Sequence, residues 1–216
     1  MGIISRFPAG ATEPYIEETY DSDGNLIDVK LHGYTKIRDN AFSDCYNLSL
    51  TSLPDEIVSI GANAFRACFS LALTSLPAGI TSIGGGAFYN CESITLTSLP
   101  AGISSIENGA FDSCTHLALT NLPSGITRVG TDAFSGCVNL ALTSLPAGIT
   151  SIGGSAFYGC TGLTELTFMG TPTSIELNAF DGCENLTTIN VPWAEGAVAN
   201  APWGATNATI NYGHTG

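Results

Sequence analysis

One short pattern recurs along this chain at a fixed interval of 23 residues. The dipeptide Ala-Phe returns in each interval, and a cysteine follows three residues after each phenylalanine. The phenylalanines are Phe42, Phe65, Phe88, Phe111, Phe134, Phe157 and Phe180. Self-similarity at a period of about 20 to 50 residues indicates a solenoid, in which each repeat buries its apolar face only by stacking on its neighbours. The repeat therefore decides the fold, and function must be sought on its surface.

Comparison of the repeats with one another predicts their interior positions. Counted from the cysteine, Leu or Ile stands at the third residue, an apolar residue at the eighth, and Ile or Val at the fifteenth of each full repeat. We expect two short extended segments per coil, one before the recurrent proline and one around Thr-Ser-Ile, with a compact turn through Ala-Phe and the cysteine. The five earlier repeats read L-x-L-T-S-L or a close variant in the first segment. Because a strand alternates with a period of two, this spacing predicts a kinked segment there.

These motifs carry a resemblance to a known family. Ala-Phe-x-x-Cys-x-x-Leu, Leu-Pro-x-x-Ile-x-x-Ile-Gly and the 23-residue step resemble the BspA-like leucine-rich repeats of bacterial surface proteins, over residues 34–192. The resemblance implies a leucine-rich repeat solenoid of short parallel β-strands and turns, with a non-enzymatic surface for adhesion or recognition. The string 191–205 also resembles the ends of such repeats in prophage and phage tail-associated proteins.

The segment before the repeats lacks their period. Residues 1–33 are predicted to form a leader and an N-terminal β-hairpin cap, with residues 1–13 weakly ordered. The hairpin joins the alternating runs 15–20 and 25–31 across an Asp-Gly turn. Its aspartates resemble the start of a calcium loop, but the glycine is misplaced and the distal glutamate is missing, so a plain turn is favoured.

The segment after the repeats, residues 193–216, is predicted to form an irregular C-terminal cap. It includes a helix-compatible stretch at 194–200 and the only two tryptophans, Trp193 and Trp203. Large aromatic side chains there are expected to cover the last coil, with stacking on a ligand as the alternative.

Net charge excludes several partners. Six Lys and Arg against nineteen Asp and Glu leave a formal charge of −13, which repels phosphate groups, so nucleic acid and anionic membranes are not expected partners. No apolar run approaches the roughly 20 residues of a spanning helix, so no membrane insertion is expected. The first residues also lack the regions of a signal peptide, although a trimmed chain would hide one.

The seven cysteines could form disulfides, bind a metal ion, or pack in the core as small apolar side chains. Equivalent side chains on stacked coils point the same way and lie about 4.8 Å apart, whereas a disulfide needs β-carbons about 3.8 Å apart. A straight ladder also does not converge on a tetrahedral zinc ion. We therefore predict reduced, buried thiols that behave as small apolar side chains.

The chain shows no arrangement suited to catalysis. The three histidines do not form a metal-binding spacing and none lies near a nucleophile in the repeat geometry. Adjacent acidic residues in exposed extended segments face apart, which does not favour acid–base pairs. We expect no enzyme activity, no cofactor and no metal site.

The turn around each cysteine changes from repeat to repeat, while the interior is monotonous. A candidate binding rim is formed by Arg66, Phe69, Tyr89, Glu92, Asp112, His116 and Tyr158. Its aromatic side chains would serve as anchors and its polar neighbours would supply selectivity. Free drift of exposed turns would produce the same variation. The repeated Thr-Ser pairs, such as 74–75, suit structural hydroxyl ladders better.

Two functions are compatible with these features. The first is a recognition or adhesion module that binds a host-cell protein or glycan, outside the cell on a bacterial surface or a virion. It would act as a monomer or as part of a larger surface assembly. The alternative is a structural spacer without a ligand.

Overall fold

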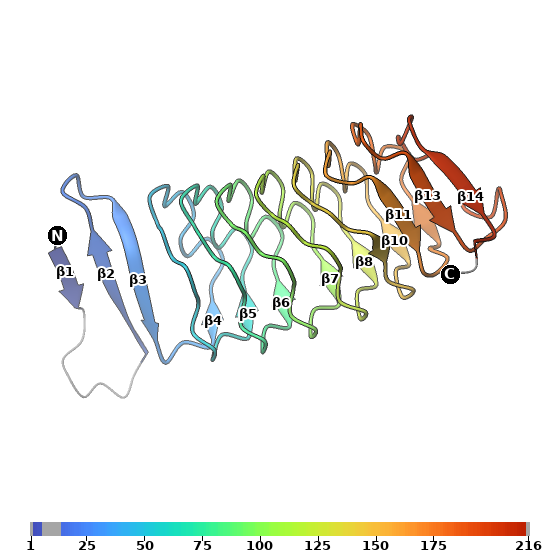
Figure 1. Ribbon diagram of the computed structural model, residues 1–216. Coiled ribbons are helices and arrows are strands. Elements are labelled where there is room, and N and C mark those ends of the chain that lie inside the picture. Colours follow the sequence, from blue (N-terminus) through green and yellow to red (C-terminus); the bar gives the residue numbers. More distant parts are fainter. Residues whose placement is uncertain (1, 6–13, 215–216) are drawn as a thin grey trace.

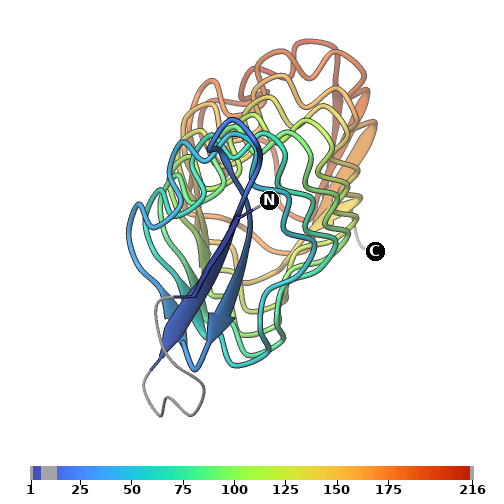
Figure 2. The same ribbon diagram turned by 90° about the vertical axis from the view of Figure 1, so that its left-hand side faces the viewer.

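The chain winds into an elongated stack of coils (Figure 1). The computed structural model describes residues 2–5 and 14–214, with side chains from residue 14 onward. This described part consists of strands and turns and contains no helix. Viewed along the stack, the coils lie one behind another, and the N-terminal hairpin crosses the near end (Figure 2). The strands are β1 (Gly2–Ser5), β2 (Tyr15–Tyr20), β3 (Leu26–His32), β4 (Lys36–Ile37), β5 (Ser59–Ile60), β6 (Ser82–Ile83), β7 (Ser105–Ile106), β8 (Arg128–Val129), β9 (Ser144–Leu145), β10 (Ser151–Ile152), β11 (Glu165–Phe168), β12 (Ser174–Ile175), β13 (Thr188–Val191) and β14 (Thr209–Tyr212).

The second segment of each coil forms parallel two-residue strands, as predicted. Ser59 pairs with Ser82 and Ile60 with Ile83, so the register advances by one repeat from coil to coil. The Ile side chain of each pair is buried, whereas the preceding residue faces solvent in part or fully. Successive side chains of a strand point to opposite faces, so even a two-residue strand directs one side chain into the core.

The first segment is kinked in the early coils, again as predicted. No strand lies there before β9 in the described chain. One backbone hydrogen bond per junction joins these segments, as between the N–H of Ala72 and the carbonyl of Leu50 at 3.0 Å. The longer strands appear where the sequence changes to alternating residues, and in β11 Leu166 and Phe168 are both buried.

Phenylalanine and cysteine form two columns along the core. The phenylalanine rings stack with centroids 5.1–5.6 Å apart. Six of the seven unpaired cysteines are buried, and Cys45 at the N-terminal end is partly exposed. Each buried thiol donates a hydrogen bond of 2.9–3.0 Å to the phenylalanine carbonyl 26 residues earlier. The cysteine is thus also a hydrogen-bond donor between coils, which its apolar role alone did not predict.

Each coil turns through positions with left-handed backbone. The residue before the cysteine has a positive φ in all seven repeats, and Asp, Asn, Ser or Gly occupies it in six of them. Ala67, with φ 56°, is the exception. A β-carbon is disfavoured in this conformation, so Ala67 carries local strain.

Replacing Ala67 by glycine is expected to stabilise the protein by about 0.5–1 kcal/mol. Relief of the left-handed strain outweighs the greater flexibility that glycine gives the unfolded chain. Ala64→Gly is the matched control, because Ala64 is fully buried and is not among the residues with positive φ. It should destabilise instead. Urea titrations of both variants measure the change in the free energy of unfolding. If neither variant or both variants were more stable than the wild type, Ala67 would not be a strained position.

The N-terminal region differs in part from expectation. The hairpin is present, with β2 and β3 antiparallel and a bulge at Thr19/Tyr20. Asp21 accepts hydrogen bonds from the backbone of Asp23 and Asn25, which closes a plain turn. Residues 2–5 were expected in a weakly ordered leader, but β1 pairs with β2 because its extended run matches an open edge. Residues 6–13 lie outside the described part.

The C-terminal region extends the stack. The helix-compatible stretch 194–200 forms turns, which lead back to the sheet edge. There β14 pairs in parallel with β13. The N–H of Phe180 donates to the carbonyl of Trp203, and both tryptophans pack against Phe168. Trp203 is fully buried and Trp193 is 6% exposed, so both rings pack inside the stack and offer no exposed face to a ligand.

Candidate functional site

The candidate rim lies at the turn that contains the cysteines. Backbone hydrogen bonds join this turn in neighbouring coils, as from Ala67 to Tyr89 at 2.7 Å and from Asn90 to Asp112 at 2.8 Å. The rim residues of the coils around Cys68, Cys91 and Cys114 are therefore close neighbours. Tyr158 lies two coils beyond Asp112, or about 10 Å further along the stack. The structure thus gathers six predicted residues and leaves Tyr158 apart.

Arg66 and Tyr89 form a stacked pair. The guanidinium of Arg66 lies 5.6 Å from the centre of the Tyr89 ring. Its Nη1 also donates to Oδ1 of Asp44 at 3.1 Å, and both partners of this ion pair are well exposed. Tyr89 was expected to be exposed, but it is half-buried because the arginine lies over its ring. A cation over an exposed aromatic ring contributes about 0.5–1 kcal/mol, which holds the arginine in place.

Tyr46 is a rim residue that sequence reasoning missed. Its ring stacks on Phe69 with centroids 5.4 Å apart, and the two side chains are 52% and 39% exposed. Both residues follow their cysteine directly, so comparison of equivalent positions could have found Tyr46. Glu92 stands at the same position in the next coil and is exposed. We call Tyr46, Arg66, Phe69, Tyr89 and Glu92 the corner cluster.

His116 has a structural partner. Its Nδ1 lies 2.7 Å from the carbonyl oxygen of Glu92, so it donates there when this nitrogen carries the proton. Ser93 occupies the equivalent position one coil earlier and donates to the carbonyl of Phe69 at 2.6 Å. Asn185 does the same to Thr161 at 2.8 Å. The imidazole is exposed, yet its contact repeats one that other coils make with smaller side chains.

Asp112 is turned into the coil and was expected at the surface. It is half-buried, and burial raises the pKa of its carboxyl group. The hydroxyl of Ser113 donates to its Oδ1 at 2.9 Å, which partly offsets this effect. Asp112 is therefore less available to a partner than Glu92.

The Thr-Ser pairs do not form the expected hydroxyl ladder. Thr74 and Ser75 are exposed, and no hydrogen bond joins their side chains to the described part of the protein. Threonine hydroxyl groups bond the preceding coil at other positions: Thr81, Thr127 and Thr150 in the second segment, Thr161 directly after its cysteine, and Thr187 in the first segment of the last repeat. At each of these positions a carbonyl group of the preceding coil lies within reach of the hydroxyl group.

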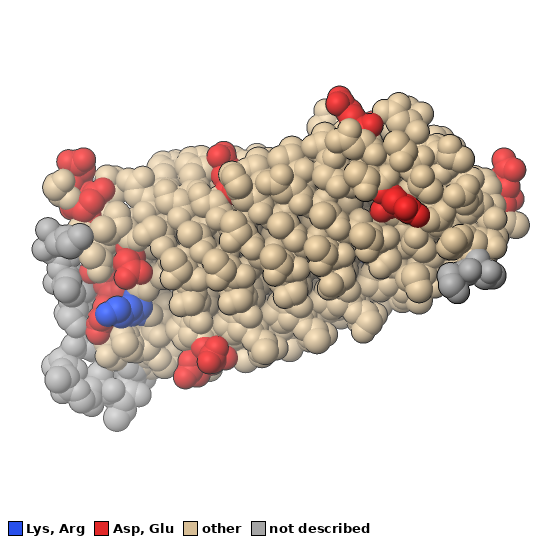
Figure 3. All heavy atoms as spheres, in the orientation of Figure 1, with Lys and Arg blue, Asp and Glu red and all other residues tan. Residues whose placement is uncertain are grey.

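Charge is sparse over the middle of one face of the stack (Figure 3). On the face that carries β3, β11 and β13, the charged side chains lie mainly toward the two ends (Figure 3). Within residues 14–214, no three His, Cys, Asp or Glu side chains gather where they could hold a metal ion. A membrane-crossing helix is likewise not found in the part of the chain that the structure describes.

Known proteins share this architecture. A leucine-rich repeat protein of T. pallidum superposes with a TM-score of 0.61 at 26% identity, over 83% of this chain and 90% of that one. A leucine-rich repeat protein of Bacteroides ovatus gives 0.56 at 23%, over 87% of this chain and 45% of its own length. A leucine rich cell surface protein of Faecalibacterium prausnitzii gives 0.51 at 22%, over 87% and 70%. No curated protein matches the chain.

The family follows from the repeats themselves. The model of the BspA type leucine rich repeat region matches in six copies, over residues 35–153 and 129–196. These matches cover the coils whose phenylalanine and cysteine columns form the core. The chain belongs to the BspA-type leucine-rich repeat family.

Proposed function

We propose that this protein is a non-enzymatic recognition or adhesion module whose corner cluster binds a host-cell protein or glycan. The exposed stack of Tyr46 on Phe69 carries the proposal. Aromatic side chains and arginine are enriched at protein interfaces and among the residues that contribute most of the binding energy. Arg66 and Glu92 beside the stack supply the polar contacts that select one partner.

The scaffold favours this use of the cluster. A solenoid holds its corner residues rigidly, so little conformational entropy is lost when a partner binds. Tyr46, Phe69 and Glu92 occupy one column with a spacing of about 4.8 Å per coil, which allows them to act together. A bacterial surface location is supported by the family and by the F. prausnitzii cell surface protein of the same fold. A phage particle is the other location that fits the resemblance of the C-terminal string.

The double variant Tyr46→Ser, Phe69→Ser is expected to weaken target binding at least tenfold. Both side chains are exposed, so the free energy of unfolding should change by no more than about 1 kcal/mol. A glycan array and a panel of purified extracellular-matrix proteins, probed with the intact protein, provide the binding measurement.

The matched control lies on the same corner of the stack, in the coils around Cys137 and Cys160. Val138→Ser, Tyr158→Ser removes two apolar side chains that are 40% and 52% exposed, and it should bind like the wild type. If only this control loses binding, the corner cluster is not the site. If the wild-type protein binds nothing in either array, the spacer function replaces the proposal.

A further inference from the structure

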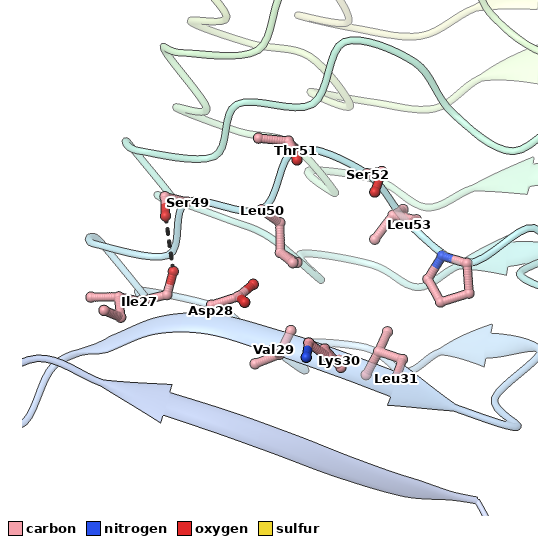
Figure 4. A pocket seen from close by; sticks show the side chains of 11 residues that line it. Ile27, Asp28, Val29, Lys30, Leu31, Ser49, Leu50, Thr51, Ser52 and Leu53 are labelled. Atoms are coloured by element: carbon pink, nitrogen blue, oxygen red, sulfur yellow. Dashed lines mark hydrogen bonds between the residues drawn. The ribbon is translucent and has the colours of Figure 1, made fainter. Parts of the chain in front are cut away.

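A groove separates the N-terminal hairpin from the first coil (Figure 4). Its volume is 560 Å³. One wall is β3, from Ile27 to Leu31, and the other is the first segment of the coil, from Ser49 to Pro54. It lies apart from the corner cluster, whose residues do not line it.

The groove exists because β3 leaves the path of a coil. The N–H of Ser49 donates to the carbonyl of Ile27 at 2.9 Å, just as Ala72 donates to Leu50 one coil later, again 22 residues apart. β3 thus takes the place of a preceding first segment. Beyond Ile27, no backbone hydrogen bond joins residues 28–32 to residues 50–54 in the described chain, as is also the case beyond the single bond between the first segments of the early coils. The hairpin strand runs straight, while the coil segment bends away from it (Figure 4).

This arrangement leaves a strand edge open. β3 pairs with β2 along one edge only. In an antiparallel pair, alternate residues direct their N–H and C=O groups away from the partner, so part of β3 presents unpaired backbone groups to the groove. On the facing wall Thr51 and Ser52 are exposed, and their side chains make no hydrogen bond to described residues.

The groove also has an apolar floor. Val29, Leu50 and Leu53 are buried there, at 3%, 7% and 6% exposure. Leu50 points from the coil toward β3 (Figure 4). A strand placed between the walls would direct every second side chain onto this floor and the others to the hydroxyl groups above.

We propose that the groove binds an extended, uncharged peptide segment, rich in β-branched residues, by strand addition to β3. Residues 28–32 offer an edge of about 16 Å, at roughly 3.3 Å per residue, which fits five residues of such a segment. One acidic and one basic side chain, Asp28 and Lys30, line the groove, so its walls carry no net charge. The net charge of −13 disfavours acidic peptides.

The protein contains a strand of this kind in the same column of the stack. β13 has the sequence Thr-Ile-Asn-Val and pairs in parallel on both edges, with β11 and with β14. A synthetic peptide with the sequence of residues 186–192, blocked at both ends, is therefore a suitable probe. Its control carries proline in place of Ile189, which removes a backbone donor and disfavours pairing.

Fluorescence anisotropy of the labelled probe with the intact protein tests the proposal. Thr51→Trp places a bulky side chain in the groove and should weaken binding at least tenfold. Thr97→Trp is the matched control, since Thr97 is exposed at the equivalent position two coils away, outside the groove. It should bind as the wild type does, and the proline peptide should not bind. Hydrogen exchange should slow at the amides of residues 28–32 when the probe binds.

Three results would overturn the proposal. These are failure of the peptide to bind at its solubility limit, equal binding by the two tryptophan variants, and binding without protection of β3. Maltoheptaose serves as a second probe. If maltoheptaose binds, Thr51→Trp weakens that binding and the peptide does not bind, then the groove is a glycan site and the peptide assignment is wrong. The corner-cluster variant should bind the peptide normally, so this test is independent of the proposed adhesive function.

Discussion

Raising the pH from 8 to 10 is expected to lower the free energy of unfolding by several kcal/mol. Burial raises the pKa of the Cys68 and Cys183 thiols from 9.0 to about 12, and that of Cys114 well above its usual value. The folded protein therefore keeps these protons after the unfolded chain has begun to lose them. Stability is fully present below pH 9 and is lost as the pH rises from 9 toward 12. Each buried thiol contributes a loss of about 1.4 kcal/mol per pH unit in that range.

Urea titrations at half-unit steps from pH 8 to pH 10.5 measure this effect. A variant with one thiol fewer is the control, because it isolates the contribution of a single thiol. Cys114→Ala should be less stable at pH 8. Its free energy of unfolding should nevertheless fall less steeply with pH, by about 1.4 kcal/mol per pH unit, because one buried thiol is missing. A free energy of unfolding that stays constant up to pH 10.5 would show that the thiols are not buried as a column.

Phe111→Ala is expected to destabilise the protein by about 3–5 kcal/mol, because it leaves a cavity in the middle of the core. The ring is fully buried and stacks on Phe88 and Phe134, with centroids 5.4 and 5.6 Å away. In a solenoid the coils contact only their neighbours, so the cavity weakens two interfaces at once. We expect the unfolding transition to broaden as the two halves lose their coupling.

Phe42→Ala is the matched comparison. Phe42 is the first ring of the column, stacks on Phe65 alone and is 6% exposed. Its loss should cost about half as much as that of Phe111, because one interface is affected and the site is closer to solvent. Thermal and chemical unfolding of both variants provide the measurement. Equal costs for the two would contradict a core that is held together coil by coil.

The repeat period by itself determined the coil, its core and its stacking direction. Leu, Ile, Phe and Cys recur in register, and a repeat too small to bury them alone can do so only against the next copy. The kink of the first segment also followed from spacing, since Leu73 and Leu76 cannot share one face of a strand. Such features depend on contacts between equivalent positions, which the period makes visible.

The tertiary structure decided what depends on contacts between unlike positions. The Cys68 thiol, for example, donates to the carbonyl of Phe42, which holds a different position of the repeat 26 residues earlier. The tail returns to the sheet, where β14 pairs with β13, although the stretch 194–200 is compatible with a helix. The groove arises where a straight hairpin strand meets a bent coil segment. The sequence does not show which two residues form such a contact, because their relative position is fixed only when the whole stack has formed.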